Sequence, residues 1–472
     1  MLFYFLPFFT IVCAVYFLLP SRFQNSLLLL ASLLFYACIA PYYLPLFISL
    51  TLFNFVFAQW IESHVDLYRR LLFFAAIATN LAILCAFRYF DFLNIHASEI
   101  ARILDWNYSA SSVSLLLPIG LSFLVFQSIS YVVEVYRGKY SAEKSFVPYA
   151  LYSLFFARIL SGPIERPSSF LPQLASARGL DRQRVVFGLE RILWGFFKKI
   201  VIADNIALLT THVWSNLPGA SGFTLFLLAF LYPFQMYADF SGYVDIALGS
   251  AGVLGIRLTE NFNHPFSSRS ITEYWQRWHM SLSNWLRDYL YYPLAFSGAR
   301  KTQLRRYISL FVTFVLIGLW HGAHWTFFAF GIINGTYRVL NSALSAPLAR
   351  VWQITDSARL PTAALQMIAT YCLTVVSLLF FGAPSVPEAW YVLTHMFTMT
   401  MADSSSIGIP LVTLMAVLVA IVSMEIVQWR AARGETTIDY IPLARWSSYG
   451  AIFAMIIIFG NLHPLPFIYF QF

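Results

Sequence analysis

Long apolar runs recur along nearly the whole chain, and they leave few folds open to it. Charged residues make up only 11% of the 472 residues, whereas a soluble domain has roughly 25%. A helix that spans a bilayer needs about 20 apolar residues, so the runs predict roughly 11 to 13 transmembrane helices. We therefore expect an all-α polytopic membrane protein with some re-entrant or interfacial helices, folded as a single integral-membrane domain over residues 1–472.

Lysine and arginine are distributed unevenly between these runs. Two basic blocks, residues 257–306 and 430–445, alternate with four intervals that contain neither residue, namely 201–256, 307–337, 360–429 and 446–472. Cytoplasmic loops carry an excess of lysine and arginine, so the basic blocks are expected in the cytoplasm. The formal net charge of +8 then mostly reflects topology, with a smaller part left to attract an anionic cytosolic ligand. No nucleic-acid partner is expected.

Proline, glycine and polar residues mark where helices break. Residues 1–62 are expected to form three helices, broken at Pro20 and Pro41, and residues 96–112 a surface loop. Residues 155–174 hold too many helix breakers for a membrane helix, so a re-entrant segment or a cytoplasmic elbow is expected there. The first segment lacks the positive start and the cleavage site of a signal peptide, so we expect a retained helix.

Two histidines lie between apolar runs. His321 and His324 follow one charge-free stretch, residues 307–319, and precede another, residues 325–337, so His321 is expected deep in the membrane. The two stretches are expected to form a hairpin of helices, with His321 near its turn. An ionisable side chain at such depth is a functional candidate, and a structural hydrogen bond between helices is the alternative. No nearby carboxylate or cysteine completes a metal set with these histidines, and the four cysteines lack metal spacing, so no metal is expected.

The apolar run 231–255 contains the polar sequence Met-Tyr-Ala-Asp-Phe-Ser-Gly-Tyr-Val-Asp. Its carboxylates, Asp239 and Asp245, are costly inside a bilayer unless they are paired or hydrated. Water or a polar substrate is therefore expected to reach this segment. The alternative is that both aspartates only tie helices together.

The basic block 257–306 contains a further candidate histidine. The sequence Ser270-Ile271-Thr272-Glu273 matches a capping box, and the apolar positions after it share one face of a helix that continues to Tyr289. At 100° per residue, His279 lies at the edge of that face, so its side chain is expected to point inward.

Together these stretches resemble the membrane-bound O-acyltransferase family, and most of all its bacterial branch that acetylates alginate, cellulose and other exopolysaccharides. The similarity spans nearly the whole chain, and the motifs are highly specific as a set. They are Leu117-Pro118-Ile119-Gly120, Gly162-Pro163, Phe197-Lys198-Lys199 with Ala203-Asp204-Asn205, Tyr237 to Tyr243, Asn261-Phe262-Asn263, Trp275 to Tyr289, Trp320-His321-Gly322 with Trp325-Thr326-Phe327, and Phe467 to Phe472. Residues 293–299 depart from the glycine-rich turn that is usual in this branch.

The resemblance implies a helical bundle like that of the family, and a reaction. The invariant intramembrane histidine of the family falls on His321, and its second motif position falls on His279. A neutral imidazole, with an unperturbed pKa near 6.5, can take the proton of a hydroxyl acceptor as it attacks a thioester, a general-base role worth about 10² to 10⁴ in rate. His321 is the expected base, and His279 is expected to orient the thioester or stabilise the oxyanion. The expected substrate- or donor-binding residues are Asp239, Ser241, Tyr243, Asn261, Trp278, Trp320, Lys198 and Lys199.

The expected activity is transfer of an acetyl group from cytosolic acetyl-CoA across a bacterial inner membrane, for O-acetylation of an exported polysaccharide. The expected partners are the lipid bilayer and a periplasmic acetyltransferase or polysaccharide-modifying subunit. Two alternatives stay open. One is transfer of D-alanyl or another acyl group to a cell-envelope polymer, and the other is a non-enzymatic transporter or scaffold.

Overall fold

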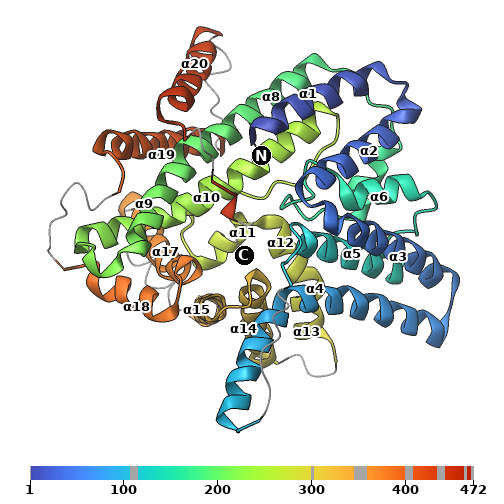
Figure 1. Cartoon of the computed structure of the whole chain (residues 1–472), viewed down its shortest axis with the longest axis horizontal. Helices are drawn as coiled ribbons and strands as arrows, with labels where there is room; N and C mark the ends of the chain where they lie inside the picture. Colours follow the sequence, from blue (N-terminus) through green and yellow to red (C-terminus); the bar gives the residue numbers. More distant parts are fainter. Residues whose placement is uncertain are drawn as a thin grey trace. The chain divides into compact units, whose positions relative to one another are not determined.

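The computed structural model describes residues 2–106, 115–298, 302–344, 359–398, 408–432, 442–461 and 465–468, and within these ranges the regular structure is helical throughout (Figure 1). Seven described helices are long and apolar enough to cross a membrane. They are α2 (Ser21–Ile39), α3 (Leu44–Ser63), α4 (Asp66–Ile103), α10 (Gly222–Val253), α14 (Gln303–His321), α17 (Arg359–Gly382) and α19 (Leu411–Ala432). Three shorter apolar helices are α1 (Leu2–Leu18), α5 (Leu121–Tyr136) and α20 (Pro442–Phe459). The prediction of an all-α polytopic membrane protein is confirmed.

The chain divides into two compact units. Unit 1 comprises Met1–Ile192 and Ile246–Thr259, and unit 2 comprises Leu193–Asp245 and Glu260–Phe472. Two of the three boundaries fall inside helices, in α8 (Arg182–Phe197) and in α10, and the third, between Thr259 and Glu260, falls in the irregular segment after α10. The single domain expected from the sequence stays a prediction.

Unit 1 is built around α2, α3, α4 and α5, with the short helices α6 (Phe146–Leu154) and α7 (Pro167–Leu174). The three helices expected in residues 1–62 are confirmed as α1, α2 and α3. Helices α3 and α4 are joined by Asn54 and Asn80, whose fully buried side-chain amides donate to each other's oxygens at 3.2 and 2.7 Å. This reciprocal pair satisfies two amides that lipid could not.

The breaker-rich stretch before α7 is irregular and buried, as the sequence predicts. Arg158 donates to the side-chain oxygen of Gln127 on α5. Glu165 accepts the backbone N–H of Thr259 at 2.5 Å and its hydroxyl at 3.0 Å. The backbone of this stretch is also satisfied by side chains: the Phe156 N–H donates to the Ser32 hydroxyl at 2.9 Å, and the Glu165 carbonyl accepts the Tyr152 hydroxyl at 3.1 Å. Non-helical backbone inside a membrane protein must be satisfied by the protein itself.

One boundary prediction is wrong. Residues 96–103 continue α4 instead of forming a surface loop. The polar side chains do not end the helix because they are satisfied locally, as shown by His96, whose Nδ1 lies 2.8 Å from the Phe92 carbonyl oxygen one turn back. Part of the expected loop, residues 107–112, lies outside the described residues.

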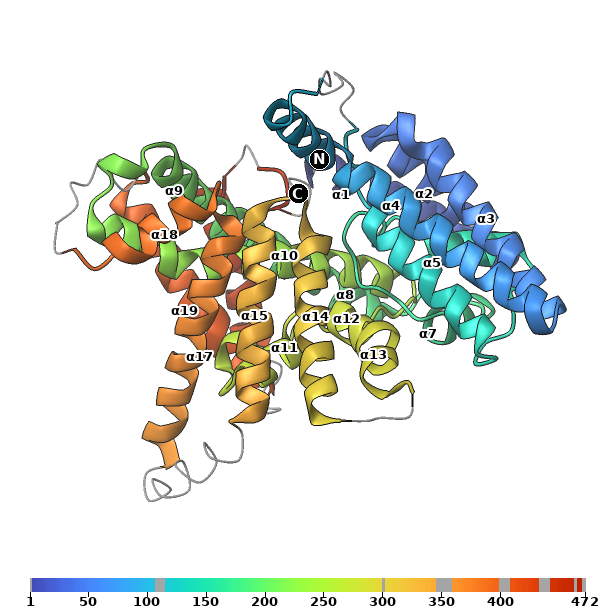
Figure 2. The same cartoon turned by 90° about the horizontal axis from the view of Figure 1, so that it is seen from below.

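Unit 2 contains the predicted hairpin of apolar helices. Helices α14 and α15 (Trp325–Ala343) run side by side, and α17 packs against α15 (Figure 2). Short helices precede the hairpin in the chain, and α11 also packs against α15. The other helices of this unit are α9 (Asp204–Ser215), α11 (Ile271–Arg277), α12 (Met280–Leu286), α13 (Tyr292–Phe296) and α18 (Val386–His395), together with two π-helical stretches, η2 (Lys198–Ala203) and η5 (Arg287–Tyr291).

Candidate active site

His321 is the last residue of α14, where the hairpin helices come into close contact. Gly318 permits this approach, because a Cβ there would collide with the carbonyl oxygen of Phe327 and lie 3.0 Å from Gly331. His321 is 6% exposed, and its ring meets the ring of Phe381 edge-on, with the centroids 4.9 Å apart. The structure therefore places His321 in a buried aromatic setting, and its depth in the membrane stays a prediction.

His279 lies between α11 and α12 and not within one helix. Its backbone is left-handed, with φ 44° and ψ 53°, so the prediction of a continuous helix from Ser270 to Tyr289 is wrong at this residue. The capping box is confirmed, since Ser270 accepts the N–H of Glu273 at 3.1 Å and the Glu273 carboxylate accepts the N–H of Arg269 at 2.8 Å.

The break at His279 turns its side chain inward, and that part of the prediction is confirmed. His279 is 1% exposed, and its ring centroid lies 4.7 Å from that of Phe240 on α10. Burial lowers the pKa of His279 to about 3. The imidazole is therefore neutral near pH 7, with one ring nitrogen as donor and the other as acceptor.

Trp320 contacts both candidate histidines. Its ring centroid lies 4.8 Å from that of His321 and 6.4 Å from that of His279. The indole is itself buried, so it forms a shared wall between the two imidazoles. The structure thus brings together the three residues that the sequence placed in two different motifs.

Asn261 holds the start of α12. Its carbonyl accepts the N–H of Met280 at 2.9 Å, and its Oδ1 accepts the N–H of Ser281 at 3.0 Å. These two N–H groups directly follow His279, so Asn261 fixes the left-handed turn that aims the imidazole. Trp278, also buried, packs edge-on against Phe262 with the ring centroids 5.1 Å apart. The structure gives both residues a positioning role, and substrate binding by them stays a prediction.

Lys198 is buried within unit 2 and is paired with a carboxylate of α10. Its Nζ lies 2.7 Å from Oδ2 of Asp245 and donates to the Ser241 hydroxyl at 3.2 Å. The ammonium also lies 5.5 Å from the ring centroid of Tyr237. These contacts direct the charge of Lys198 at α10 and do not leave it for a donor phosphate.

Lys199 is buried even more completely, and it binds two carboxylates. Its Nζ lies 2.6 Å from Oδ1 of Asp239 and 2.8 Å from Oδ1 of Asp204. Burial alone would lower the pKa of Lys199, but the two carboxylates outweigh it and the pKa is raised. Both lysines are thus paired with carboxylates of the chain, and donor binding by Lys198 and Lys199 stays a prediction. Their pairing fits the alternative that the aspartates of α10 tie helices together.

The group formed by Lys199 and its two aspartates also contacts the described segment 465–468. Asp239 Oδ2 accepts the N–H of Ile468 at 2.8 Å, while the ring of Phe467 lies 4.7 Å from the Lys199 ammonium. Tyr243 meets Phe467 edge-on, with the ring centroids 5.2 Å apart. We call Lys199, Asp204 and Asp239 the aspartate clasp. Tyr243 and Asp239 both contact this segment of the chain, and substrate binding by them stays a prediction.

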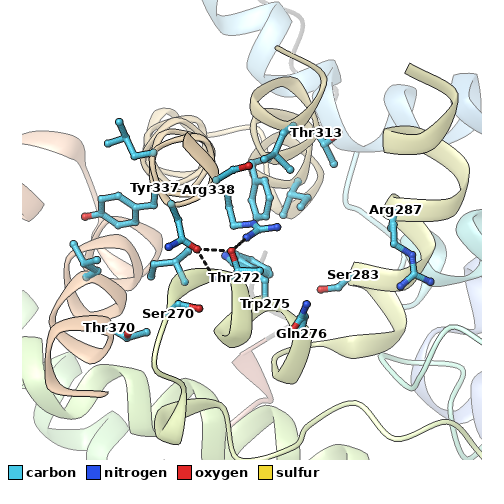
Figure 3. A pocket seen from close by; sticks show the side chains of 18 of the residues that line it. Ser270, Thr272, Trp275, Gln276, Ser283, Arg287, Thr313, Tyr337, Arg338 and Thr370 are labelled. Carbon is cyan, nitrogen blue, oxygen red and sulfur yellow. Dashed lines mark hydrogen bonds between the residues drawn. The ribbon is translucent and has the colours of Figure 1, made fainter. Parts of the chain in front are cut away.

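A cavity of about 1040 Å³ lies among α11, α12, α14, α15 and α17 of unit 2 (Figure 3). Met280, next to His279 in sequence, and Ile317, one turn before His321, both line it. Exposed residues such as Arg269 and Leu340 also line it, so the cavity is open to the surface. Among the residues that the structure describes, its lining has no aspartate, glutamate, lysine or histidine, and its three charged side chains are those of Arg269, Arg287 and Arg338.

None of the predicted site residues lines this cavity, and the sequence reasoning missed the residues that do. Thr272 and Trp275 were noticed only as part of a helix pattern. Arg338 had a usable signal, because it is the first charged residue after the charge-free interval that contains His321. Its position beside α11 depends on packing between segments about 65 residues apart, which no local pattern shows. Among the residues that the structure describes, no group of three metal-ligating side chains occurs.

Comparison with known proteins agrees with this geometry. A family model described as the membrane-bound O-acyltransferase family matches residues 140–382. The chain is 35% identical over 399 residues to the probable alginate O-acetylase of Azotobacter vinelandii, covering 84% of this chain and 77% of the relative. It is 31% identical to the peptidoglycan O-acetyltransferase of Helicobacter pylori, covering 57% of this chain and 55% of the relative. It is 32% identical to the teichoic acid D-alanyltransferase of Bacillus subtilis, covering 46% and 56% respectively. The chain therefore belongs to the membrane-bound O-acyltransferase family and is a multi-pass membrane O-acyltransferase.

Proposed function

We propose that this enzyme transfers an acetyl group from cytosolic acetyl-CoA across the bacterial inner membrane, for O-acetylation of an exported polysaccharide. One observation carries the proposal. Two buried histidines both contact Trp320, and residues close to them in the chain line a cavity whose described charged residues are all arginines. The relatives named as acetylating alginate and peptidoglycan support an acetyl group and an envelope polymer.

His321 is proposed as the general base. A neutral imidazole accepts the proton of the acceptor hydroxyl while that oxygen forms a bond to the thioester carbonyl carbon. The carbon–sulfur bond then breaks, and the leaving thiolate takes the proton back from the imidazolium, so that coenzyme A leaves as the thiol. The buried aromatic setting of His321 keeps bulk water away, which limits hydrolysis of the thioester.

His279 is proposed to help by donating a hydrogen bond to the carbonyl oxygen as it becomes negative. Its lowered pKa keeps the imidazole neutral, so it acts as a fixed dipole and not as a cation. Asn261 supports this role by holding the turn on which His279 sits.

The charge pattern supports the side from which the donor enters. The lining residues from Arg269 to Tyr292, which form one part of the cavity's lining, all belong to the basic block 257–306, and the positive-inside rule predicts that this block is cytoplasmic. Acetyl-CoA is a cytosolic thioester, so a cavity built from this block suits it. The acceptor then lies on the far side, where we propose a periplasmic acetyltransferase or polysaccharide-modifying subunit as partner.

The test uses strains that carry His321→Ala or His324→Ala. His324 is a matched control, because it lies three residues away but is exposed and bonded to the Thr326 hydroxyl at 2.9 Å. Alkali-released acetate from the purified envelope polysaccharides is measured in each strain. Loss of acetate with His321→Ala and retention with His324→Ala is expected. If the His321→Ala strain releases as much acetate as wild type while the protein is present in the membrane, the proposal is overturned.

D-alanyl transfer is the second candidate, because a teichoic acid D-alanyltransferase is among the relatives. A competition between acetyl-CoA and a D-alanyl carrier protein, offered to the purified enzyme, separates the two. Consumption of the D-alanyl thioester alone would replace acetyl as the transferred group.

A further inference from the structure

Arg338 stands out among the charged residues that line the cavity. It extends from α15, and its Nη1 donates to the hydroxyl of Thr272 on α11, as Figure 3 shows. Thr272 in turn donates to the Oδ1 of Asn341, so the guanidinium is held by neutral groups. Its carbon lies 5.9 Å from the ring centroid of Phe314, which limits the space in which it can move.

The positive charge of Arg338 has no carboxylate to balance it in the described part of the chain. No ion pair within 4.0 Å involves it there, and its buried Nε has no hydrogen-bond partner among the described residues. Buried charges in proteins are normally paired, because an unpaired charge out of water is costly. A partly buried guanidinium that faces a large cavity therefore calls for an anion from outside the described chain.

The other two arginines of the cavity differ from Arg338. Arg287 is exposed, and its Nε lies 2.8 Å from Oδ1 of Asp288, so its charge is largely balanced. Arg269 is exposed as well. In Figure 3 Arg287 lies beside Ser283, apart from the Arg338 and Thr272 pair. These two exposed arginines attract anions in general, whereas Arg338 offers a fixed and partly buried fork of N–H donors.

We propose that Arg338 is the residue that recognises a phosphate of the thioester donor, a phosphopantetheine-type molecule. The inference rests on the proposed function, because it takes the cavity as the donor site. It adds the residue that selects the donor: Arg338 binds one of the phosphates that the donor carries. A cavity of about 1040 Å³ is at the large end for ligand sites, which suits an extended donor better than a small acyl anion. The phosphate can come from free coenzyme A or from a carrier protein.

Equilibrium binding to the full-length protein in detergent tests this without turnover. The probes are coenzyme A, 4′-phosphopantetheine and phosphate-free pantetheine, and the variants are Arg338→Met, Arg338→Lys and the control Arg182→Met. Arg182 is an exposed arginine that does not line the cavity. Arg338→Met is expected to weaken the binding of coenzyme A and of 4′-phosphopantetheine by about 10- to 100-fold, because a hydrogen bond to a charged group is lost. The binding of pantetheine is expected to stay unchanged.

Arg338→Lys is expected to recover part of the affinity, since it keeps the charge but not the fork. It also shows that a loss in the methionine variant is not a folding defect. Weakening of coenzyme A but not of 4′-phosphopantetheine also supports the inference and assigns Arg338 to a nucleotide phosphate. A carrier protein with its phosphopantetheine arm, used as a fourth probe, separates the two sources of the donor.

Three results would overturn the inference. If Arg338→Met and wild type bind coenzyme A with equal affinity, Arg338 does not recognise the phosphate, and this holds even when wild-type turnover of acetyl-CoA supports the proposed function. If pantetheine binding weakens as much as coenzyme A binding, Arg338 acts through packing. Absence of binding of every phosphate probe to wild type, together with absence of thioester turnover, overturns the proposed function as well.

Discussion

Replacing Lys199 with methionine tests whether the aspartate clasp stabilises unit 2. The change removes the ammonium that lies 2.6 Å from Asp239 and 2.8 Å from Asp204, and leaves two carboxylates in a site where every partner is at most 6% exposed at its side chain. Breaking a buried ion pair from one side costs about 3 to 5 kcal/mol, because the remaining charge is uncompensated. At about 2 °C per kcal/mol for a chain of this size, the apparent unfolding midpoint is expected to fall by roughly 6 to 10 °C.

The cost of Lys199→Met is expected to depend on pH. Burial raises the pKa of Asp204 to about 7 while Lys199 lowers it, so without the lysine the pKa rises further. A carboxyl whose folded pKa is raised contributes stability at low pH, and that stability is lost as pH rises through the folded pKa. Lys199→Met is therefore expected to be less destabilised at pH 6 than at pH 8.

The assay is thermal unfolding of the purified protein in detergent, followed by intrinsic fluorescence. Lys198→Met is the matched control, because it leaves one carboxylate, Asp245, whose side chain is 10% exposed, and a smaller drop is expected. Adding Asp204→Asn and Asp239→Asn to Lys199→Met removes both stranded charges and is expected to recover most of the midpoint. A Lys199→Met midpoint within about 1 °C of wild type at pH 8 would refute the reasoning that gives this pair its magnitude.

Three further changes have defined outcomes. His279→Asn should remove the loss of stability that wild type shows below pH 6.5, and asparagine tolerates the left-handed backbone of this position. Burial holds the folded pKa of His279 near 3, so wild type should be about 2 kcal/mol less stable at pH 5 than at pH 7.5. The unfolding midpoint at both pH values measures this difference. Asn261→Ala should cost about 1 to 3 kcal/mol by stranding the N–H of Ser281, with Asn261→Asp recovering part, again from unfolding midpoints. Gly318→Ala should lower the midpoint by separating α14 from α15, while Gly252→Ala, where a Cβ meets nothing within 4 Å, should not; equal effects would contradict the packing argument.

Much of the fold can be predicted from the sequence because it depends on local composition. The apolar runs predicted membrane helices, and the charge-free intervals predicted the α14–α15 hairpin. The inward position of His279 was predicted correctly from helical periodicity, although the helix itself breaks there. A left-handed backbone at a residue other than glycine has no sequence signature here, since Asn261 imposes it from a different segment.

The charged residues of the site were harder to predict. Lys198 and Lys199 follow the pattern of the positive-inside rule, so their burial against α10 could not be inferred from charge counting. Arg338 ends a charge-free interval and was missed for the same reason, because a charge at the end of a helix normally signals topology. Pairing between segments far apart in the chain decides which of these charges are structural and which face a cavity.

Release of free coenzyme A from acetyl-CoA by the purified protein in liposomes tests the central claim most directly. Wild type, His321→Ala and His324→Ala are compared with the candidate periplasmic partner and acceptor glycan present and omitted. The account predicts that His321→Ala loses about 10² to 10⁴ of the rate while His324→Ala keeps it, with all three proteins folded by gel filtration. Equal turnover by His321→Ala and wild type would contradict the account and leave His321 as a structural histidine.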